Sequence, residues 1–120
     1  RPKHLALNEI RLPLPGKVSI LHRVSGAGLF LMLPVLLALF GSSVGSPESY
    51  AAYKDIVGNI FVKLLLVGLL WAYLHHFCAG IRFLLLDAHI GIDKQSAVNS
   101  ARLVLIVSLT LTFLLVAKLW

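Results

Sequence analysis

The sequence predicts an all-α membrane protein with three transmembrane helices. Of its 120 residues, 58% are hydrophobic and only 13% are charged, which is far more apolar than an ordinary soluble domain of this size. Three long apolar runs account for most of that excess. Because backbone polar groups inside a bilayer must be satisfied within their own segment, each run is expected to form a helix. The length allows a single domain, residues 1–120.

The first helix is expected over about residues 22–44, which is long enough to cross a hydrocarbon core of about 30 Å. The segment before it, 1–21, holds Pro13 and Pro15, which should interrupt any continuous helix. Its leucines and isoleucine are too numerous for open water, so we expect it at the membrane interface or under a soluble partner. A loop over 45–55 follows, and Ser46-Pro47-Glu48 within it predict the start of a short surface helix.

The second helix is expected over about 56–86 and the third over about 102–120, joined by a loop over 87–101. The second run exceeds the thickness of the hydrocarbon core, so that helix should tilt or protrude. Lys118 and Trp120 are suited to the interface at the end of the third helix.

The positions of lysine and arginine predict the orientation. Eight lie on one side of the predicted spans and three on the other, namely Arg1, Lys3, Arg11, Lys17, Arg23, Arg82, Lys94 and Arg102 against Lys54, Lys63 and Lys118. The positive-inside rule places the amino terminus and the second loop in the cytoplasm, or in the matrix of an organelle. The net charge of +6 comes without a basic face bearing aromatics, so we expect membrane lipid and no nucleic acid as partner. Cys78 is the only cysteine, which excludes a disulfide within the chain.

Polar residues within the second span indicate a possible haem ligand. His76 and Gly80 are four residues apart and share one helix face, which Ala72 continues. A histidine with small neighbours one turn away leaves room for a flat macrocycle. The alternative is a histidine hydrogen-bonded to a neighbouring helix, with small residues that serve only packing. His75 is rotated by about 100° from His76, so both cannot face the same ligand.

A second axial histidine is not expected from this chain. His76 is roughly 15 Å from the cytoplasmic end of its helix, whereas His22 lies at the mouth of the first helix and His89 lies in the loop. Neither should reach an iron bound at His76. We therefore expect the second ligand from another polypeptide, which makes the chain a subunit.

A second polar cluster lies at the mouth of the first span. Ser19 and Arg23 are four residues apart, and Arg23 offers planar donors for a propionate or a carbonyl. Together with His22, they could bind haem propionates and a quinone ring. The alternative is that Arg23 extends to lipid headgroups and Ser19 caps the helix. In the second span, Arg82 and Asp87 are expected to pair or to lie at the interface.

Two motifs resemble those of a known family. The first is an amino-terminal Arg-Pro followed, with characteristic spacing, by residues 19–26, Ser-Ile-Leu-His-Arg-Val-Ser-Gly; the second is His76-x-x-x-Gly-Ile-Arg followed by Asp87. With the three-span layout, the resemblance covers essentially the whole chain. The sequence resembles the cytochrome b556 membrane-anchor subunit of succinate dehydrogenase, respiratory complex II, in its bacterial form.

The resemblance implies a bundle shared with a second membrane-anchor subunit, with one haem b between the two chains and one histidine from each. His76 matches the axial ligand of the haem iron, Ser19 and Arg23 match the ubiquinone site, and His22 and Arg23 match residues near the haem propionates. Succinate oxidation would belong to a flavoprotein subunit and electron delivery to an iron–sulfur subunit, in a complex of the bacterial inner membrane. Phe83 departs from members that carry a second histidine there.

Two other functions remain open from the sequence. One is a haem-free structural membrane anchor, in which the histidines only pack. The other is a small proton or cation transport subunit that uses His75, His76 and Arg82 as a relay. The first and third spans offer no matching acidic residue in mid-membrane, which disfavours the relay.

Overall fold

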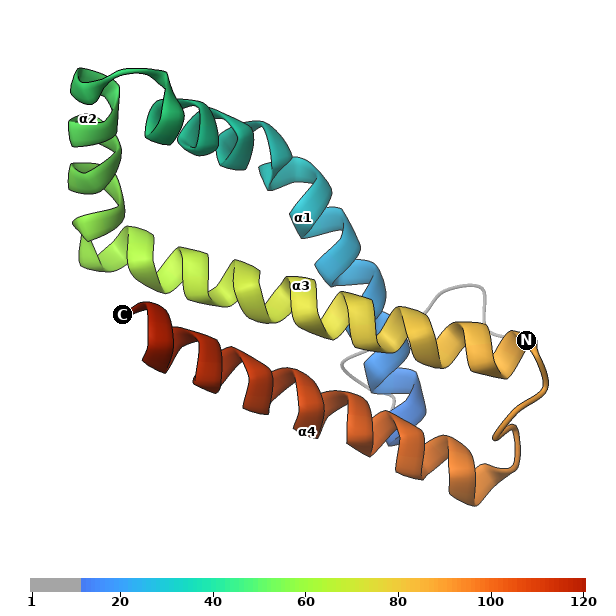
Figure 1. Ribbon diagram of the computed structural model, residues 1–120. Coiled ribbons are helices and arrows are strands. Elements are labelled where there is room, and N and C mark those ends of the chain that lie inside the picture. Colours follow the sequence, from blue (N-terminus) through green and yellow to red (C-terminus); the bar gives the residue numbers. More distant parts are fainter. Residues whose placement is uncertain (1–11) are drawn as a thin grey trace.

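The computed structural model describes residues 12–120, which form four α-helices (Figure 1). They are α1 (Leu14–Gly45), α2 (Pro47–Gly58), α3 (Ile60–Asp87) and α4 (Lys94–Leu119). Helices α1, α3 and α4 are each long and apolar enough to cross a membrane. This confirms the predicted class, an all-α membrane protein with three spans.

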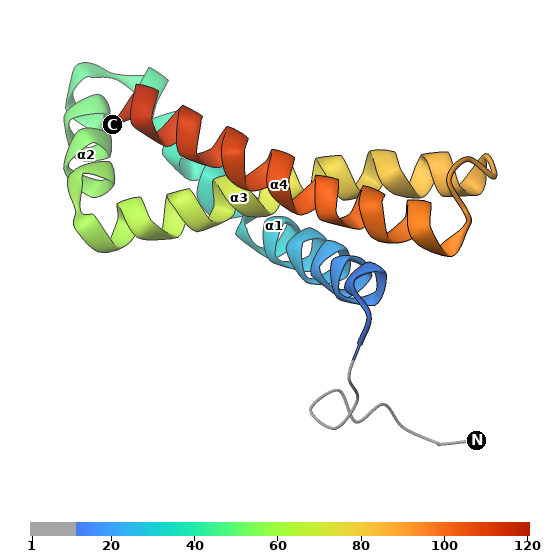
Figure 2. The same cartoon turned by 90° about the horizontal axis from the view of Figure 1, so that it is seen from below.

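Helix α3 lies at the centre of the arrangement. It packs against α1 on one side and runs beside α4, which returns in the opposite direction (Figures 1 and 2). Helix α1 crosses α3 near the second half of α3, and the beginning of α1 also contacts α4. Toward their other ends α1 and α3 diverge, and α2 bridges them (Figure 1). The helices therefore meet most closely around the α1–α3 crossing.

Helix α1 begins at Leu14, well before the expected start near residue 22. Pro13 is its N-cap residue and Pro15 lies in its first turn. Proline is tolerated there because the first N–H groups of a helix have no intrahelical partner. The two prolines therefore begin the helix instead of interrupting it. Residues 1–11 of the predicted amino-terminal segment lie outside the described part of the chain.

The short helix expected after the first span is confirmed as α2. Ser46 caps it in a reciprocal capping box, in which the Ser46 hydroxyl accepts from the Ser49 backbone N–H at 3.0 Å and the Ser49 hydroxyl accepts from the Ser46 N–H at 2.9 Å. Asn59 then ends α2 and caps α3, accepting from the N–H of Phe61 at 2.9 Å. Helix α3 consequently starts at Ile60, not near residue 56.

Helix α4 begins within the predicted loop 87–101, at Lys94 instead of near residue 102. The Asp93 carboxylate caps it by accepting from the Ser96 N–H at 3.1 Å. Hydrogen bonds from Ser96 hold the pKa of Asp93 below its ordinary value of 3.8. The connection from α3 is short, and it turns through His89 (φ 59°) and Gly91 (φ 69°), both in the left-handed region.

The interior of the described chain is more polar than its surface. Five polar residues are buried, against four apolar ones: Ser25, His75, Arg82, Ser108 and Thr112, and Val18, Ala79, Ala101 and Val104. Large apolar side chains are outside, with Phe61 77% exposed and Phe30 75% exposed. Small and polar contacts between helices surrounded by exposed apolar side chains are typical of a protein whose solvent is lipid.

Candidate functional site

The histidines that the sequence placed at different depths lie side by side. The imidazole rings of His22 and His76 are stacked with 4.1 Å between their centroids and 4° between their planes. The prediction that His22 and His76 lie at different depths was wrong. Helix α1 begins at Leu14, which places His22 roughly 12 Å along that helix. The crossing of α1 and α3 then brings the two rings together.

The structure nevertheless keeps these two histidines from binding one iron. The lone pair of an imidazole nitrogen lies in the plane of its ring, and the two planes here are nearly parallel. In this arrangement, the ring nitrogens point past one another and do not converge on a shared metal. That His22 is not the second ligand stays a prediction, which the orientation of the rings supports and the depth of His22 does not.

One ring nitrogen of His76 is held by α1. Nδ1 lies 3.0 Å from the backbone oxygen of His22 and 3.2 Å from the hydroxyl of Ser25, and that hydroxyl donates to the same backbone oxygen at 2.9 Å. Because a carbonyl oxygen only accepts, Nδ1 must carry the proton. In the neutral ring, Nε2 then keeps its lone pair, and no hydrogen bond within residues 12–120 occupies it.

The glycine that fixes the place of the His76 ring is Gly26 on α1. A Cβ added at Gly26 would lie 2.8 Å from Cε1 and 3.2 Å from Nδ1 of His76, which is closer than packing allows. Gly80, which the sequence analysis singled out, faces Nε2 of His22 at 3.8 Å instead. The space that the sequence predicts for a macrocycle beside Gly80 is therefore occupied by His22. The ring centroids of His22 and Phe83 are 5.0 Å apart.

His75 occupies a different environment, as its rotation around the helix predicts. It is fully buried, and its ring is tilted against Trp71 with 5.3 Å between centroids. The backbone of Val18 is a polar neighbour, but neither ring nitrogen reaches a hydrogen-bond partner among the described residues. The indole N–H of Trp71 donates to Ser108 on α4 at 3.2 Å. His75 thus packs between helices, whereas His76 faces the α1–α3 crossing.

Ser19 and Arg23 lie one turn apart on α1, close to His22 in the chain. Ser19 does not cap the helix, because the helix starts earlier; its hydroxyl donates to the backbone oxygen of Pro15 at 3.0 Å. Arg23 is exposed. The two side chains therefore lie on a surface of the described chain and not inside a closed pocket.

The expected pairing of Arg82 with Asp87 does not form. Arg82 is buried, and its hydrogen bonds go to Ser100 and to the backbone oxygen of Ala97 on α4. Asp87 is exposed at the end of α3. Sequence spacing could not reveal these partners, since they belong to the next helix.

A groove of about 380 Å³ opens between α1 and α3 beside the histidines. It is lined largely by small and apolar residues, namely Leu21, Val24, Ser25, Gly28, Gly68, Leu69, Trp71, Ala72 and His75. A Cβ added at Gly28 or Gly68 would meet no atom within 4 Å. The described chain therefore leaves an indented surface on the side of the crossing.

Comparisons with known proteins identify related transmembrane subunits. A family model described as succinate dehydrogenase/fumarate reductase transmembrane subunit matches residues 1–115. The succinate dehydrogenase cytochrome b556 subunit of Paracoccus denitrificans is 30% identical over 114 residues, 95% of this chain and 88% of that protein. The subunit of the same name from Coxiella burnetii is 38% identical over 88 residues, 72% of this chain and 70% of that protein. The subunit of the same name from Rickettsia felis is 29% identical over 115 residues, 96% of this chain and 90% of that protein.

Proposed function

This chain belongs to the succinate dehydrogenase/fumarate reductase transmembrane subunit family, and we propose that it binds haem b through His76 and helps to form a ubiquinone-reduction site. Its role is that of a membrane-anchor cytochrome b subunit of succinate dehydrogenase. Within that role, we propose the haem ligand, the quinone and the partner subunits.

The state of the His76 ring carries the haem proposal. Metal-binding histidines usually donate the N–H of one ring nitrogen to an oxygen, which fixes the tautomer and leaves the other nitrogen for the metal. His76 meets that requirement through the backbone oxygen of His22 and the hydroxyl of Ser25. Gly26 keeps the space that the ring needs. The residues present therefore fit a haem ligand, and Nε2 is the nitrogen that would bind the iron.

A haem b would be shared with a second membrane-anchor subunit that supplies the other axial histidine. Within residues 12–120, His22 is stacked with His76, His75 is buried on another face, and His89 is exposed in the α3–α4 loop. When bound, the haem supplies a one-electron donor and acceptor within the membrane. The indented surface between α1 and α3 offers small residues against which a partner helix can pack.

His22 and Arg23 are proposed to lie near the haem propionates. Both belong to α1, and His22 also supplies the backbone oxygen that contacts His76. The exposed guanidinium of Arg23 presents planar, permanently charged donors, which suit a carboxylate.

Ser19 and Arg23 are proposed to bind ubiquinone. The Ser19 hydroxyl can turn from the Pro15 carbonyl to donate to a quinone oxygen, and Arg23 on the same face can donate to that oxygen as well. Both donors polarise the carbonyl and stabilise negative charge that develops on the ring as electrons and protons arrive. An exposed site of this kind is completed by neighbouring subunits.

The other subunits are proposed to be an iron–sulfur protein and a flavoprotein, the latter being where succinate is oxidised. This chain would then contribute to succinate:ubiquinone oxidoreductase without oxidising succinate itself. The distribution of Lys and Arg, eight against three, supports a cytoplasmic amino terminus in a bacterial inner membrane.

The haem assignment is tested by the spectrum of the purified, dithionite-reduced complex. His76→Ala should abolish the b-type absorption band, whereas the matched variant of the neighbouring histidine, His75→Ala, should retain it. A b-type band of full intensity in the His76→Ala complex would overturn the assignment.

The quinone assignment is tested separately by activity. Ser19→Ala and Arg23→Leu should each remove quinone reduction while succinate oxidation by an artificial dye continues. Retention of quinone reduction in both variants would contradict the proposed site, and loss of dye reduction as well would contradict the assignment of succinate oxidation to another subunit.

A further inference from the structure

Arg82 is a buried cation whose protein partners are both neutral. It is 5% exposed. Its Nε donates to the Ser100 hydroxyl at 2.9 Å and one terminal nitrogen donates to the Ala97 backbone oxygen at 3.3 Å. A guanidinium has five N–H donors and stays charged, and charged side chains at membrane depth are normally paired. Within residues 12–120, the two bonds of Arg82 leave both its charge and its other donors uncompensated.

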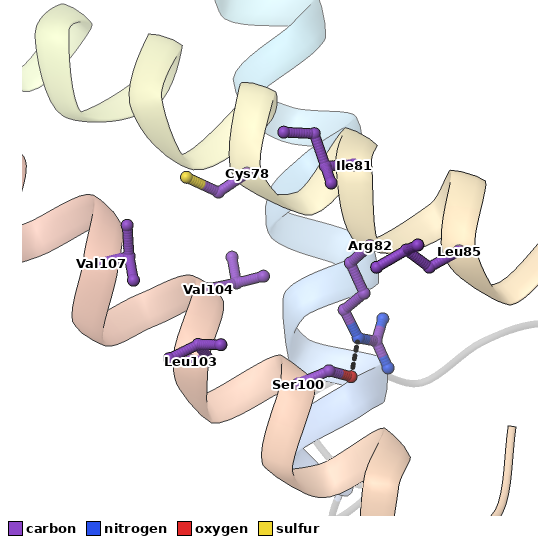
Figure 3. A pocket seen from close by; sticks show the side chains of 8 residues that line it. All are labelled: Cys78, Ile81, Arg82, Leu85, Ser100, Leu103, Val104 and Val107. Atoms are coloured by element: carbon purple, nitrogen blue, oxygen red, sulfur yellow. Dashed lines mark hydrogen bonds between the residues drawn. The ribbon is translucent and has the colours of Figure 1, made fainter. Parts of the chain in front are cut away.

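Arg82 is one of the residues that line an apolar groove between α3 and α4. The groove has a volume of about 210 Å³, and its lining is apolar except for Arg82 and Ser100. Figure 3 shows the Arg82 side chain reaching from α3 toward Ser100 on α4. One apolar lining residue, Leu85, lies nearer the end of α3 than Arg82 does. The other apolar lining residues lie further from the helix ends, namely Cys78, Ile81, Leu103, Val104 and Val107.

Arg82 and Ser100 lie nearer to the helix ends than most of the apolar lining does. Arg82 is about 8 Å from the last residue of α3, and Ser100 is about 9 Å from the first residue of α4. Val107 lies roughly 10 Å further along α4 than Ser100. The groove therefore has a cation near the helix ends and apolar side chains that extend from it toward the middle of both helices.

We propose that this groove binds one acidic phospholipid. The lipid phosphate accepts hydrogen bonds from the donors of Arg82 that the protein leaves unused, which supplies the missing negative charge. One acyl chain lies along Leu103, Val107 and Cys78. A carboxylate from a partner helix could neutralise Arg82, but an acyl chain also matches the apolar remainder of the groove.

The first experiment measures the lipid that stays with the complex through purification in a neutral detergent. Arg82→Gln keeps a donor for Ser100 but removes the charge. It should retain about tenfold less phosphatidylglycerol and cardiolipin per complex, the effect of one charge-assisted hydrogen bond. Arg102→Gln, which removes an exposed arginine of α4, is the matched control and should retain the amount found in the unaltered complex. Equal retention in Arg82→Gln would overturn the proposal.

The second experiment locates the lipid and does not depend on altering Arg82. The delipidated, unaltered complex is given phosphatidylglycerol with a photoactivatable acyl chain, and the labelled peptides are identified by mass spectrometry. Labels should fall on Cys78, Leu103 and Val107, and Val107→Phe should reduce them by filling the groove.

Phosphatidylcholine with the same acyl chain is the control for charge. Equal labelling by the two lipids, or labels confined to other surfaces, would overturn the proposal. Loss of the second anchor from Arg82→Gln with unchanged lipid retention would assign the anion to a partner carboxylate and would equally overturn it.

Discussion

The two ends of the bundle are stabilised in different ways. At the crossing end, which holds Val18, Ser25, His75, Ala79 and Arg82, side chains from α1, α3 and α4 are buried against one another. At the α2 end, no residue of α2 is buried, and the Ser46 capping box and a hydrogen bond from Ser49 to the Ser42 backbone oxygen at 2.8 Å are local contacts.

Residues at the crossing end therefore position the candidate site around His76, whereas residues at the α2 end position the connection between α1 and α3. Side chains at the crossing end are constrained by other helices, so a change to a residue that contacts His76 should disturb its ring. Side chains at the α2 end are constrained by their own turn, so a change there should alter only local order. Variants at the two ends should therefore differ in their effect on haem binding.

The largest effect is expected from Gly26→Val. The added side chain would overlap the His76 ring, because even a Cβ at this position would approach Cε1 to 2.8 Å. Overpacking of this kind costs about 1–3 kcal/mol, and a displaced ring should lose most of its haem. The reduced spectrum measures the haem content per complex.

Gly41→Val is the matched control for Gly26→Val, because Gly41 does not line the groove proposed for the partner helix. It lies on the same helix, but a Cβ there meets no atom within 4 Å, so the folded subunit should tolerate it. A similar loss of haem from both variants would show that α1 responds to any larger residue and not to contact with His76.

A smaller effect is expected from Ser25→Ala. This variant removes one of the two oxygens near Nδ1 of His76 but keeps the backbone oxygen of His22. Loss of such an outer contact typically weakens metal binding by about 10- to 100-fold. Haem titration of the purified complex should show the weaker binding, with a b-type band still visible at saturation.

Ser43→Ala is the control for Ser25→Ala from the α2 half of the same helix. Its hydroxyl also bonds to a backbone oxygen three residues earlier, that of Phe40, and no histidine is involved. Haem affinity should be unchanged. Weakening by both variants to the same extent would contradict the separation of the two ends.

Ser108→Ala should lower stability without changing the haem spectrum. Its hydroxyl accepts the indole N–H of Trp71, and leaving this partly buried donor without its partner should cost about 1 kcal/mol, the low end of the range for buried donors. Thermal unfolding of the complex in detergent should occur at a lower temperature. Trp71→Phe, which removes the donor together with its need for a partner, should cost less; a larger loss from Trp71→Phe would contradict this explanation.

The smallest effect is expected at the first turn of α4. Asp93 is exposed, and hydrogen bonds from Ser96 lower its pKa, so its capping contribution is present at neutral pH and is lost as the pH falls through that lowered value. Asp93→Ala should increase amide exchange in this turn at neutral pH. The difference from the unaltered chain should disappear in acid, while the haem spectrum stays the same; a difference that persisted in acid would contradict the assigned cause.

Much of the fold follows from local features of the sequence. The three apolar runs identify the long helices, and Ser46-Pro47 identifies the start of α2, because these signals depend on neighbours within a few residues. The beginning of α1 was misplaced for a related reason. Pro13 and Pro15 are compatible with a helix start as well as with a break, and the sequence alone did not decide between them.

The candidate site was less predictable because its contacts join different helices. The choice of His76 rests on a local pattern, but the stacking of His22 on it depends on where α1 crosses α3. Gly26 lies within a quoted motif, yet its close approach to His76 has no sign in local spacing. Ser100 and Ala97 as partners of Arg82 are likewise visible only after α4 has packed.

The Nδ1 contacts of His76 also bear on how the complex is assembled. Both oxygens near that nitrogen come from the same polypeptide, so the ring is oriented as soon as α1 and α3 have packed, before any other chain arrives. If His76 binds the haem as proposed, the newly made subunit already presents one half of the coordination. Cofactor insertion could then precede subunit pairing, and haem would help to select the partner that closes the site.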